Sequence, residues 1–159
     1  MILRVTQRFR APLAEVYAWC TDFQDSDPTL SRARLRTRRV LRREGGVVEM
    51  EETGVMGFPF AARFQVELEP PHGWKADGRS NMGRTLNTYR LWSEPDGTRL
   101  EITFDLRLSG PYRVMTPFAR GYVLRRLSKE WEDYARAMES GRIEQTGDGV
   151  PPPKPSLGP

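Results

Sequence analysis

The chain has 159 residues, of which 38% are hydrophobic, and its formal net charge is +4 at pH 7. This length suits one domain with a buried core, and the apolar content excludes a largely disordered chain. No run approaches the roughly 20 apolar residues of a membrane-spanning helix, and the first residues lack the apolar region of a signal peptide. The single cysteine, Cys20, has no partner for an internal disulfide. We therefore expect a cytoplasmic protein.

The positive charge comes almost entirely from arginine, because lysine occurs only at positions 75, 129 and 154. A basic protein can bind anionic lipid, nucleic acid or an acidic ligand, and the charge alone does not choose among them.

The N-terminal segment predicts a strand followed by two short helices. Residues Ile2–Arg10 alternate between apolar and polar side chains, which is typical of a strand with one buried face. Pro12 suits the first turn of a short helix, and Thr21 and Asp22 can start a second one that runs to Leu30.

The segment Ala33–Arg43 contains six arginines and is predicted to form a hairpin with Val47–Thr53 across a turn at Gly45 and Gly46. Arginines facing the glutamates of the second strand explain this composition. Proteins that bind single-stranded nucleic acid interleave aromatic and basic side chains, and this run contains no aromatic residue. We therefore expect no nucleic-acid partner.

Four further strands are predicted after an apolar loop at Gly54–Phe60. All four are bounded by turn residues, and the first and last alternate clearly between apolar and polar side chains. Their ranges are Phe60–Glu69, Trp74–Ser80, Arg84–Ser93 and Thr98–Ser109. The short connections imply that neighbouring strands pair antiparallel.

A long helix is predicted over residues 116–141. Thr116 and Pro117 suit its N-terminus, and Gly141 suits its C-terminus. Apolar residues recur in it at spacings of three and four, which predicts one buried stripe: Leu124, Leu127, Trp131, Tyr134 and Met138. The proline-rich residues 142–159 are expected to form a disordered tail.

This order of elements predicts an α+β fold. A curved antiparallel sheet of about seven strands would grip the long C-terminal helix, with two short helices after the first strand. Residues 1–141 would form the whole ligand-binding domain.

Three features resemble the helix-grip superfamily, or SRPBCC proteins, which includes START lipid-transfer domains, pollen-allergen-like proteins and polyketide cyclases. They are the segment Ala11–Tyr17, the hairpin Glu94–Leu100 and the terminal helix with Trp131. The resemblance covers roughly residues 1–140 and implies a cavity between sheet and helix for a mostly apolar small molecule. No catalytic motif of the cyclases matches, so the resemblance supplies no catalytic residue.

Residue types that carry most catalytic chemistry are sparse in this chain. The only histidine, His72, lies in a Pro-Pro-His-Gly turn and is expected at the surface. No His/Cys cluster or phosphate-binding loop is present, so we expect no metal and no cofactor, and we assign no catalytic residue. The acid–base candidates that remain are more simply the polar half of alternating strands or cavity-facing phenols: Glu49, Glu51, Glu52, Asp105, Tyr89 and Tyr122.

The predicted pocket combines the apolar faces that must meet between sheet and helix. In strand Arg84–Ser93 the inward face holds either Asn87, Tyr89 and Leu91 or the alternating set that ends at Trp92, and we favour the first. In the alternative, aromatic rings fill the space and leave no cavity. The predicted ligand-binding residues are Phe64, Val66, Asn87, Tyr89, Leu91, Ile102, Phe104, Arg120, Leu124, Leu127 and Trp131.

The apolar loop is predicted to act as a gate over the mouth of this pocket, because glycines flank exposed apolar side chains there. The gate residues are Val55, Met56 and Phe58, which would close near Met115 and Phe118. Basic residues around the gate would let it rest on an anionic membrane surface.

Arg120 lies in line with the apolar stripe of the helix, in its first turn, where a cavity mouth would lie. If it is buried, the guanidinium needs a partner, which would be Asp105, a glutamate of segment 49–52 or an acidic group on the ligand. In the other interpretation, which we favour, Arg120 sits at the rim and reaches solvent along its own stem.

Three functions are compatible with the sequence. We favour a non-enzymatic binder or carrier of a hydrophobic molecule such as a lipid, an isoprenoid or a polyketide-like compound. The alternatives are a cyclase or dehydratase acting on such a molecule and a protein-interaction module of the chaperone-assisting type. The oligomeric state is left open.

Overall fold

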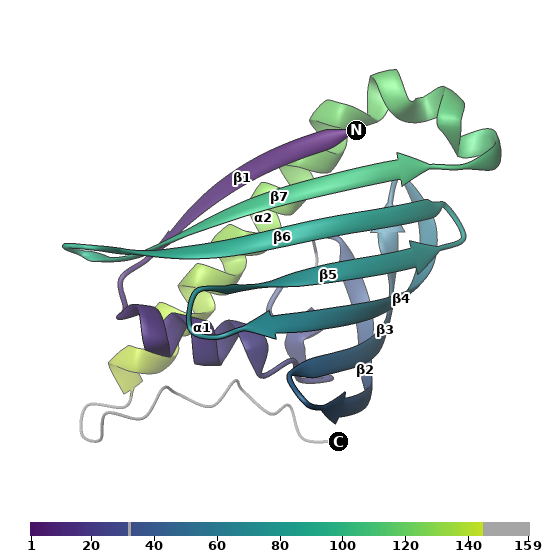
Figure 1. Ribbon diagram of the computed structural model, residues 1–159. Helices are drawn as coiled ribbons and strands as arrows, with labels where there is room; N and C mark the ends of the chain where they lie inside the picture. The colour runs from purple at the N-terminus through teal and green to yellow at the C-terminus, as the bar shows by residue number, and fades with distance from the viewer. Residues whose placement is uncertain (32, 145–159) are drawn as a thin grey trace.

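The computed structural model describes residues 1–31 and 33–144. Seven strands form one antiparallel sheet in the order β1-β7-β6-β5-β4-β3-β2, so each strand after β2 pairs with its neighbour in sequence (Figure 1). The strands are β1 (Ile2–Phe9), β2 (Leu35–Glu44), β3 (Val47–Met56), β4 (Phe58–Glu69), β5 (Gly73–Ser80), β6 (Gly83–Glu94) and β7 (Gly97–Leu108). The predicted α+β fold with a seven-stranded sheet is confirmed.

Two α-helices and two 3₁₀ segments accompany this sheet. They are α1 (Leu13–Thr21), the 3₁₀ turn η1 (Asp27–Thr29), the 3₁₀ segment η2 (Gly110–Met115) and α2 (Thr116–Glu144). The second predicted short helix is therefore a single 3₁₀ turn. Helix α2 also continues past Gly141, the predicted end. The predicted tail lies outside the described residues from 145 onward.

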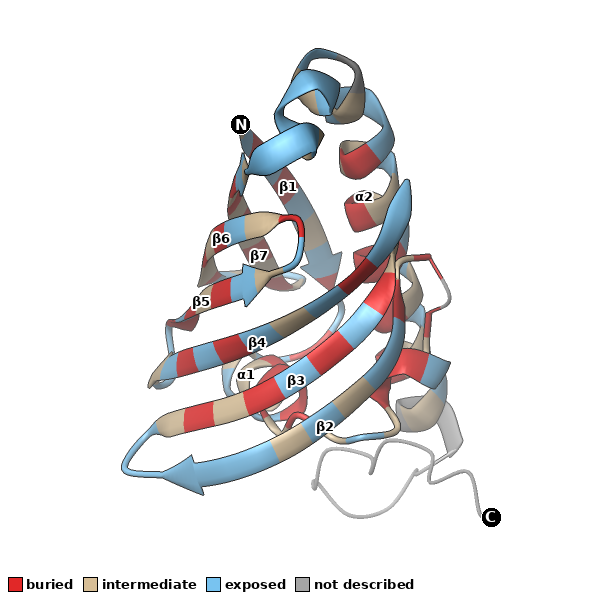
Figure 2. Cartoon of the chain, turned by 90° about the vertical axis from the view of Figure 1, so that its right-hand side faces the viewer, coloured by how far each residue is buried: buried red, intermediate tan, exposed pale blue. Residues whose placement is uncertain are grey.

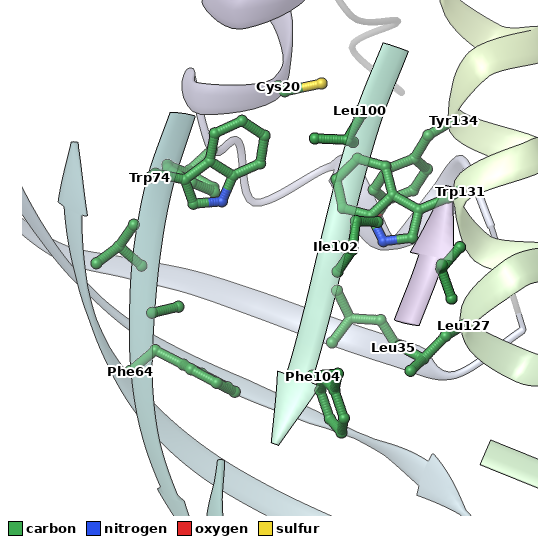
Figure 3. Packing of buried hydrophobic residues seen from close by; sticks show 14 of the residues in the cluster. Cys20, Leu35, Phe64, Trp74, Leu100, Ile102, Phe104, Leu127, Trp131 and Tyr134 are labelled. Atoms are coloured by element: carbon green, nitrogen blue, oxygen red, sulfur yellow. The ribbon is translucent and has the colours of Figure 1, made fainter. Parts of the chain in front are cut away.

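Helix α2 lies against the concave face of the curved sheet, and the core fills the space between them (Figures 1 and 2). Val123, Leu127, Trp131, Tyr134 and Met138 form its buried stripe. In Figure 3, Trp131 and Tyr134 reach from α2 toward β7, whose inner face carries Leu100, Ile102 and Phe104. The helical period and the period of two along β7 therefore predict the same layer of apolar contacts.

Strand β6 turns Asn87 and Leu91 into the core, whereas Trp92 is about half exposed on the outer face. The first of the two predicted faces thus points inward.

The predicted loop at Gly54–Phe60 is wrong, because β3 continues to Met56 and β4 begins at Phe58. Gly57 alone makes the turn, with φ at 81°, a value that favours glycine. In the sequence, the alternation of apolar and polar side chains ends at Thr53, because the next inward position is Gly54, which has no side chain. A Cβ there would lie 2.4 Å from the carbonyl oxygen of Arg34, so the close approach of β2 requires glycine.

No helix in the described part of the chain combines the length and apolar character needed to cross a membrane.

Candidate functional site

Three cavities follow one another through the interior between the sheet and α2. The outer cavity, of about 130 Å³, lies between the β3–β4 turn, η2 and the start of α2. The middle cavity, of about 20 Å³, shares Met56, Met82 and Leu106 with it. The inner cavity, of about 50 Å³, shares Arg34 and Phe64 with the middle one. A few side chains therefore divide what would otherwise be one continuous space.

Aromatic rings form much of the inner cavity wall. The rings of Trp74 and Tyr89 are stacked, with centroids 4.6 Å apart and planes at 13°. The ring of Trp131 lies 5.7 Å from Tyr89 and 5.4 Å from Tyr134. The remaining space, about 50 Å³, is smaller than the roughly 150 Å³ of an apolar cavity that holds one benzene ring. At this end of the interior, aromatic side chains therefore occupy most of the space, much as in the alternative without a cavity.

Five buried charged groups also line the inner cavity. Arg34 makes a bidentate ion pair with Glu130, with N–O distances of 2.8 and 3.1 Å. Arg38 donates two hydrogen bonds to one oxygen of Glu52, at 2.9 and 2.6 Å, and a third to Asp27. The five side chains are at most 12% exposed.

The arginines remain charged despite their burial. Burial by itself lowers the pKa of Arg34, but the carboxylates of Glu130 and Glu52 raise it above its ordinary value. For Arg38, burial again lowers the pKa, and Glu52 leads the interactions that raise it. Both guanidiniums are therefore already paired inside the protein.

Two of these carboxylates could have been found from the sequence. Glu52 lies on the inward face of β3, in phase with Val48 and Met50. Glu130 lies on the buried side of α2, three residues after Leu127 and four before Tyr134. Both positions follow from the periods of two and 3.6 residues.

Arg38 could not have been found in this way. Between Leu35 and Thr37 the register of β2 shifts, so that Leu35 faces Gly54 and Arg38 faces Glu52. This bulge reverses the phase of the strand, and Leu35 and Arg38 both turn inward although simple alternation would place them on opposite faces.

Three buried polar atoms that border these cavities have no hydrogen-bond partner among the described residues. They are the Tyr134 hydroxyl and Asn87 Oδ1 at the inner cavity and Thr85 Oγ1 at the middle one. Burial raises the pKa of Tyr134 well above its usual value, and Glu130 raises it further, so this phenol is neutral. Burial likewise raises the pKa of Tyr89. Unpartnered polar atoms of this kind are costly unless a ligand or water binds them.

The predicted gate residues gather around the outer cavity. Met56, Phe58 and Met115 line it, and the ring of Phe58 lies edge-on to Tyr112, with centroids 5.7 Å apart. Val55 is half-buried beside this lining, and the side chain of Phe118 lies outside the described part of the chain. These residues stand on a strand turn and on η2, so the gate remains a prediction.

The predicted pocket residues fall into four groups. Six line the inner cavity: Phe64, Val66, Asn87, Tyr89, Leu127 and Trp131. Phe104 lines the middle cavity. Leu91 and Ile102 are buried in the core, and Leu124 is half-buried, but none of them is in the lining of the three cavities.

Arg120 forms the fourth group, and the interpretation that buries it is wrong, because its side chain is exposed, as the interpretation at the rim expects. Its guanidinium donates a hydrogen bond of 3.3 Å to the carbonyl oxygen of Ile2 at the start of β1. The buried stripe of α2 begins at Val123, since the first turns of the helix extend past the sheet edge and only later turns cover its concave face.

No protein-family model matches the chain, and no curated protein matches it in sequence. Solved structures do resemble it. The crystal structure of TTHA0849 from Thermus thermophilus has 18% sequence identity and a TM-score of 0.76, covering 86% of this chain and 95% of that one.

Two further solved structures share this fold. The Zhui aromatase/cyclase from Streptomyces sp. R1128 has 14% identity and a TM-score of 0.74, covering 94% of this chain and 99% of that one. A START superfamily protein from Mycobacterium smegmatis has 14% identity and a TM-score of 0.70, covering 85% of this chain and 97% of that one. At these identities the similarity concerns the fold.

Proposed function

We propose that this chain, which has the helix-grip fold of the START-like proteins, binds a small and largely apolar molecule between its sheet and α2. The observation that carries the proposal is the row of three cavities from the exposed end of the molecule to the polar inner wall. Met56 and Met82, whose unbranched side chains adapt readily, separate the outer and middle cavities. Small rotations of these side chains would join the cavities for a ligand.

The chemistry of the inner wall favours binding over a cyclase reaction. The carboxylates of Glu130, Glu52 and Asp27 are all engaged in ion pairs with buried arginines. His72 is exposed in the turn between β4 and β5. Neutral tyrosines with raised pKa values are hydrogen-bond donors rather than bases, so proton abstraction from a substrate has little support here.

Ala119→Phe tests the entry route. Ala119 lines the outer cavity, and a phenylalanine there would occupy the space that the ligand must cross. Binding of N-phenyl-1-naphthylamine, a neutral fluorescent probe, is expected to weaken by about tenfold or more, or about 1.4 kcal/mol. Fluorescence titration of both proteins gives the affinities.

The matched control is Ala14→Phe, on the exposed side of α1. It should leave the affinity within about twofold, and thermal unfolding should show that both variants are folded. Equal affinity of Ala119→Phe and wild type would contradict the entry route. If a molecule that co-purifies with the protein is seen by native mass spectrometry as substrate and product together, the cyclase alternative would replace simple binding.

We further propose that the outer end rests on an anionic lipid bilayer when the ligand enters or leaves. Phe58, Val114 and Met115 are exposed there, and Val114 is 74% exposed. The sequence has no Asp or Glu between Asp105 and Glu130, and the exposed Arg113 and Arg120 lie on η2 and at the start of α2, at this end of the molecule. Apolar side chains beside cations match the chemistry of such a surface.

Vesicle sedimentation tests this second proposal. Wild type should bind vesicles that contain phosphatidylglycerol and should not bind pure phosphatidylcholine vesicles. Arg113→Glu should reduce this binding by about thirtyfold, since it removes one cation and adds one anion and each unit charge near an anionic surface contributes about 1 kcal/mol. Arg8→Glu, at the opposite end of β1, is the charge-matched control and should bind nearly as wild type does. Equal binding to the two kinds of vesicle, or none, would refute the proposal.

A further inference from the structure

The charges around the inner cavity do not favour an anionic ligand. Two guanidiniums, of Arg34 and Arg38, stand against three carboxylates, of Glu130, Glu52 and Asp27. Each guanidinium already binds a carboxylate, and Arg38 binds two. A ligand carboxylate would therefore enter a wall with an excess of negative charge and with both cations engaged.

The unpartnered atoms of the same cavity wall are complementary to a different chemical group on the ligand. Asn87 is 4% exposed, and its buried Oδ1 accepts no hydrogen bond from the described residues. Tyr134 is 7% exposed, and its hydroxyl is also unpartnered in the described part of the chain. An amide oxygen only accepts, whereas a hydroxyl both donates and accepts. A ligand hydroxyl has the chemistry that both atoms need, because it can donate to the Asn87 amide oxygen and accept from the Tyr134 hydroxyl.

We propose that the bound molecule carries an uncharged hydroxyl group at its inner end, held by Asn87 Oδ1 and the Tyr134 hydroxyl. This inference rests on the proposed binding function. When side chains move apart and widen the inner cavity, the stacked Trp74 and Tyr89 rings and the nearby Trp131 ring provide flat apolar surfaces beside this position, which suits a phenol or another hydroxylated ring. An apolar tail of the ligand extends through the middle cavity, past Phe64 and Met82.

The inference differs from the possibility, raised for a buried Arg120, that an acidic group on the ligand pairs with this arginine. That possibility depended on burial of Arg120, but this side chain is exposed. The cations that do line the inner cavity are the two arginines bound by glutamates.

Three probes that share one apolar part test the inference: para-butylphenol, para-butylbenzoate and butylbenzene. Near pH 7 a phenol is neutral and a benzoate is ionised, since phenols titrate near about pH 10 and carboxyl groups near about pH 4. Isothermal titration calorimetry should show that wild type binds the phenol at least tenfold more tightly than the benzoate. Butylbenzene should bind more weakly than the phenol, because it leaves Asn87 Oδ1 and the Tyr134 hydroxyl without a partner.

Two variants assign the hydroxyl contacts. Asn87→Leu and Tyr134→Phe each remove one polar group with little change in shape. Each should weaken binding of para-butylphenol by about five- to tenfold and leave butylbenzene within about twofold. Arg120→Leu should leave the affinities for all three probes unchanged. Thermal unfolding shows which variants are folded, and either of the two cavity variants is sufficient for the test.

The outcomes separate this inference from the proposed function. If the benzoate binds as tightly as the phenol or more tightly, or if both cavity variants weaken all three probes equally, the inference is overturned and the binding function stands. If wild type binds none of the three probes, the proposed function itself fails at this site.

Discussion

Replacing Glu130 with alanine is expected to lower the free energy of unfolding by about 3–5 kcal/mol. The substitution leaves the guanidinium of Arg34 buried without the carboxylate that accepts its two hydrogen bonds. Glu130 is 3% exposed, so water cannot replace the lost carboxylate without opening the core. Urea unfolding of the variant and of wild type measures the difference.

The matched control is an exposed pair with the same bidentate geometry. Arg84 binds both oxygens of Asp77, at 2.9 and 2.5 Å, on the outer face of the sheet. Asp77→Ala should cost less than about 1 kcal/mol, because solvent screens an exposed pair. A loss for Glu130→Ala as small as the loss for Asp77→Ala would mean that Arg34 is solvated in solution.

The double variant Arg34→Met/Glu130→Leu separates the cost of an unpaired charge from the value of the pair. Replacing a whole buried ion pair by apolar residues is often neutral or stabilising. We therefore expect the double variant to recover most of the stability that Glu130→Ala loses. A double variant as unstable as the single one would show that the pair itself stabilises the fold.

Replacing Trp131 with alanine is expected to cost about 3–5 kcal/mol of stability. The indole packs against the rings of Trp74, Tyr89 and Tyr134. Because Trp131 also borders the inner cavity, the loss should lie toward the lower end of this range. The same substitution enlarges the cavity and should change the affinity for butylbenzene.

Trp92→Ala is the control for size and residue type. Trp92 is 49% exposed on the outer face of β6, with the guanidinium of Arg99 at 6.0 Å from its ring. It should cost about 1 kcal/mol or less. A full loss of stability in Trp131→Ala without any change in the affinity for butylbenzene would exclude Trp131 from the pocket wall.

The sequence by itself was sufficient for the architecture and for most of the apolar lining. Alternation along β4 and β7 predicted the inward positions of Phe64, Val66 and Phe104, and helical spacing predicted those of Leu127 and Trp131. These patterns are reliable because a strand or helix buries the same face along its length, and each face can be read from local spacing. The turn residues between strands then favoured one antiparallel meander, which fixes the order of neighbours in the sheet.

Only the tertiary structure decided how the charged groups pair around the cavity. The β2 bulge brought Arg38 opposite Glu52, and the packing of α2 brought Glu130 to Arg34, which is 96 residues away in the chain. The first turns of α2 extend past the sheet edge, and Arg120 on these turns is therefore exposed, although it lies in line with the buried apolar stripe of the helix. The physical reason is that burial of a charge depends on a partner from another element. Local spacing shows on which face of a strand or helix a residue lies. Which residues of two elements come into contact depends on the strand register and on the angle at which the helix crosses the sheet, and both are set only when the whole sheet packs against the helix.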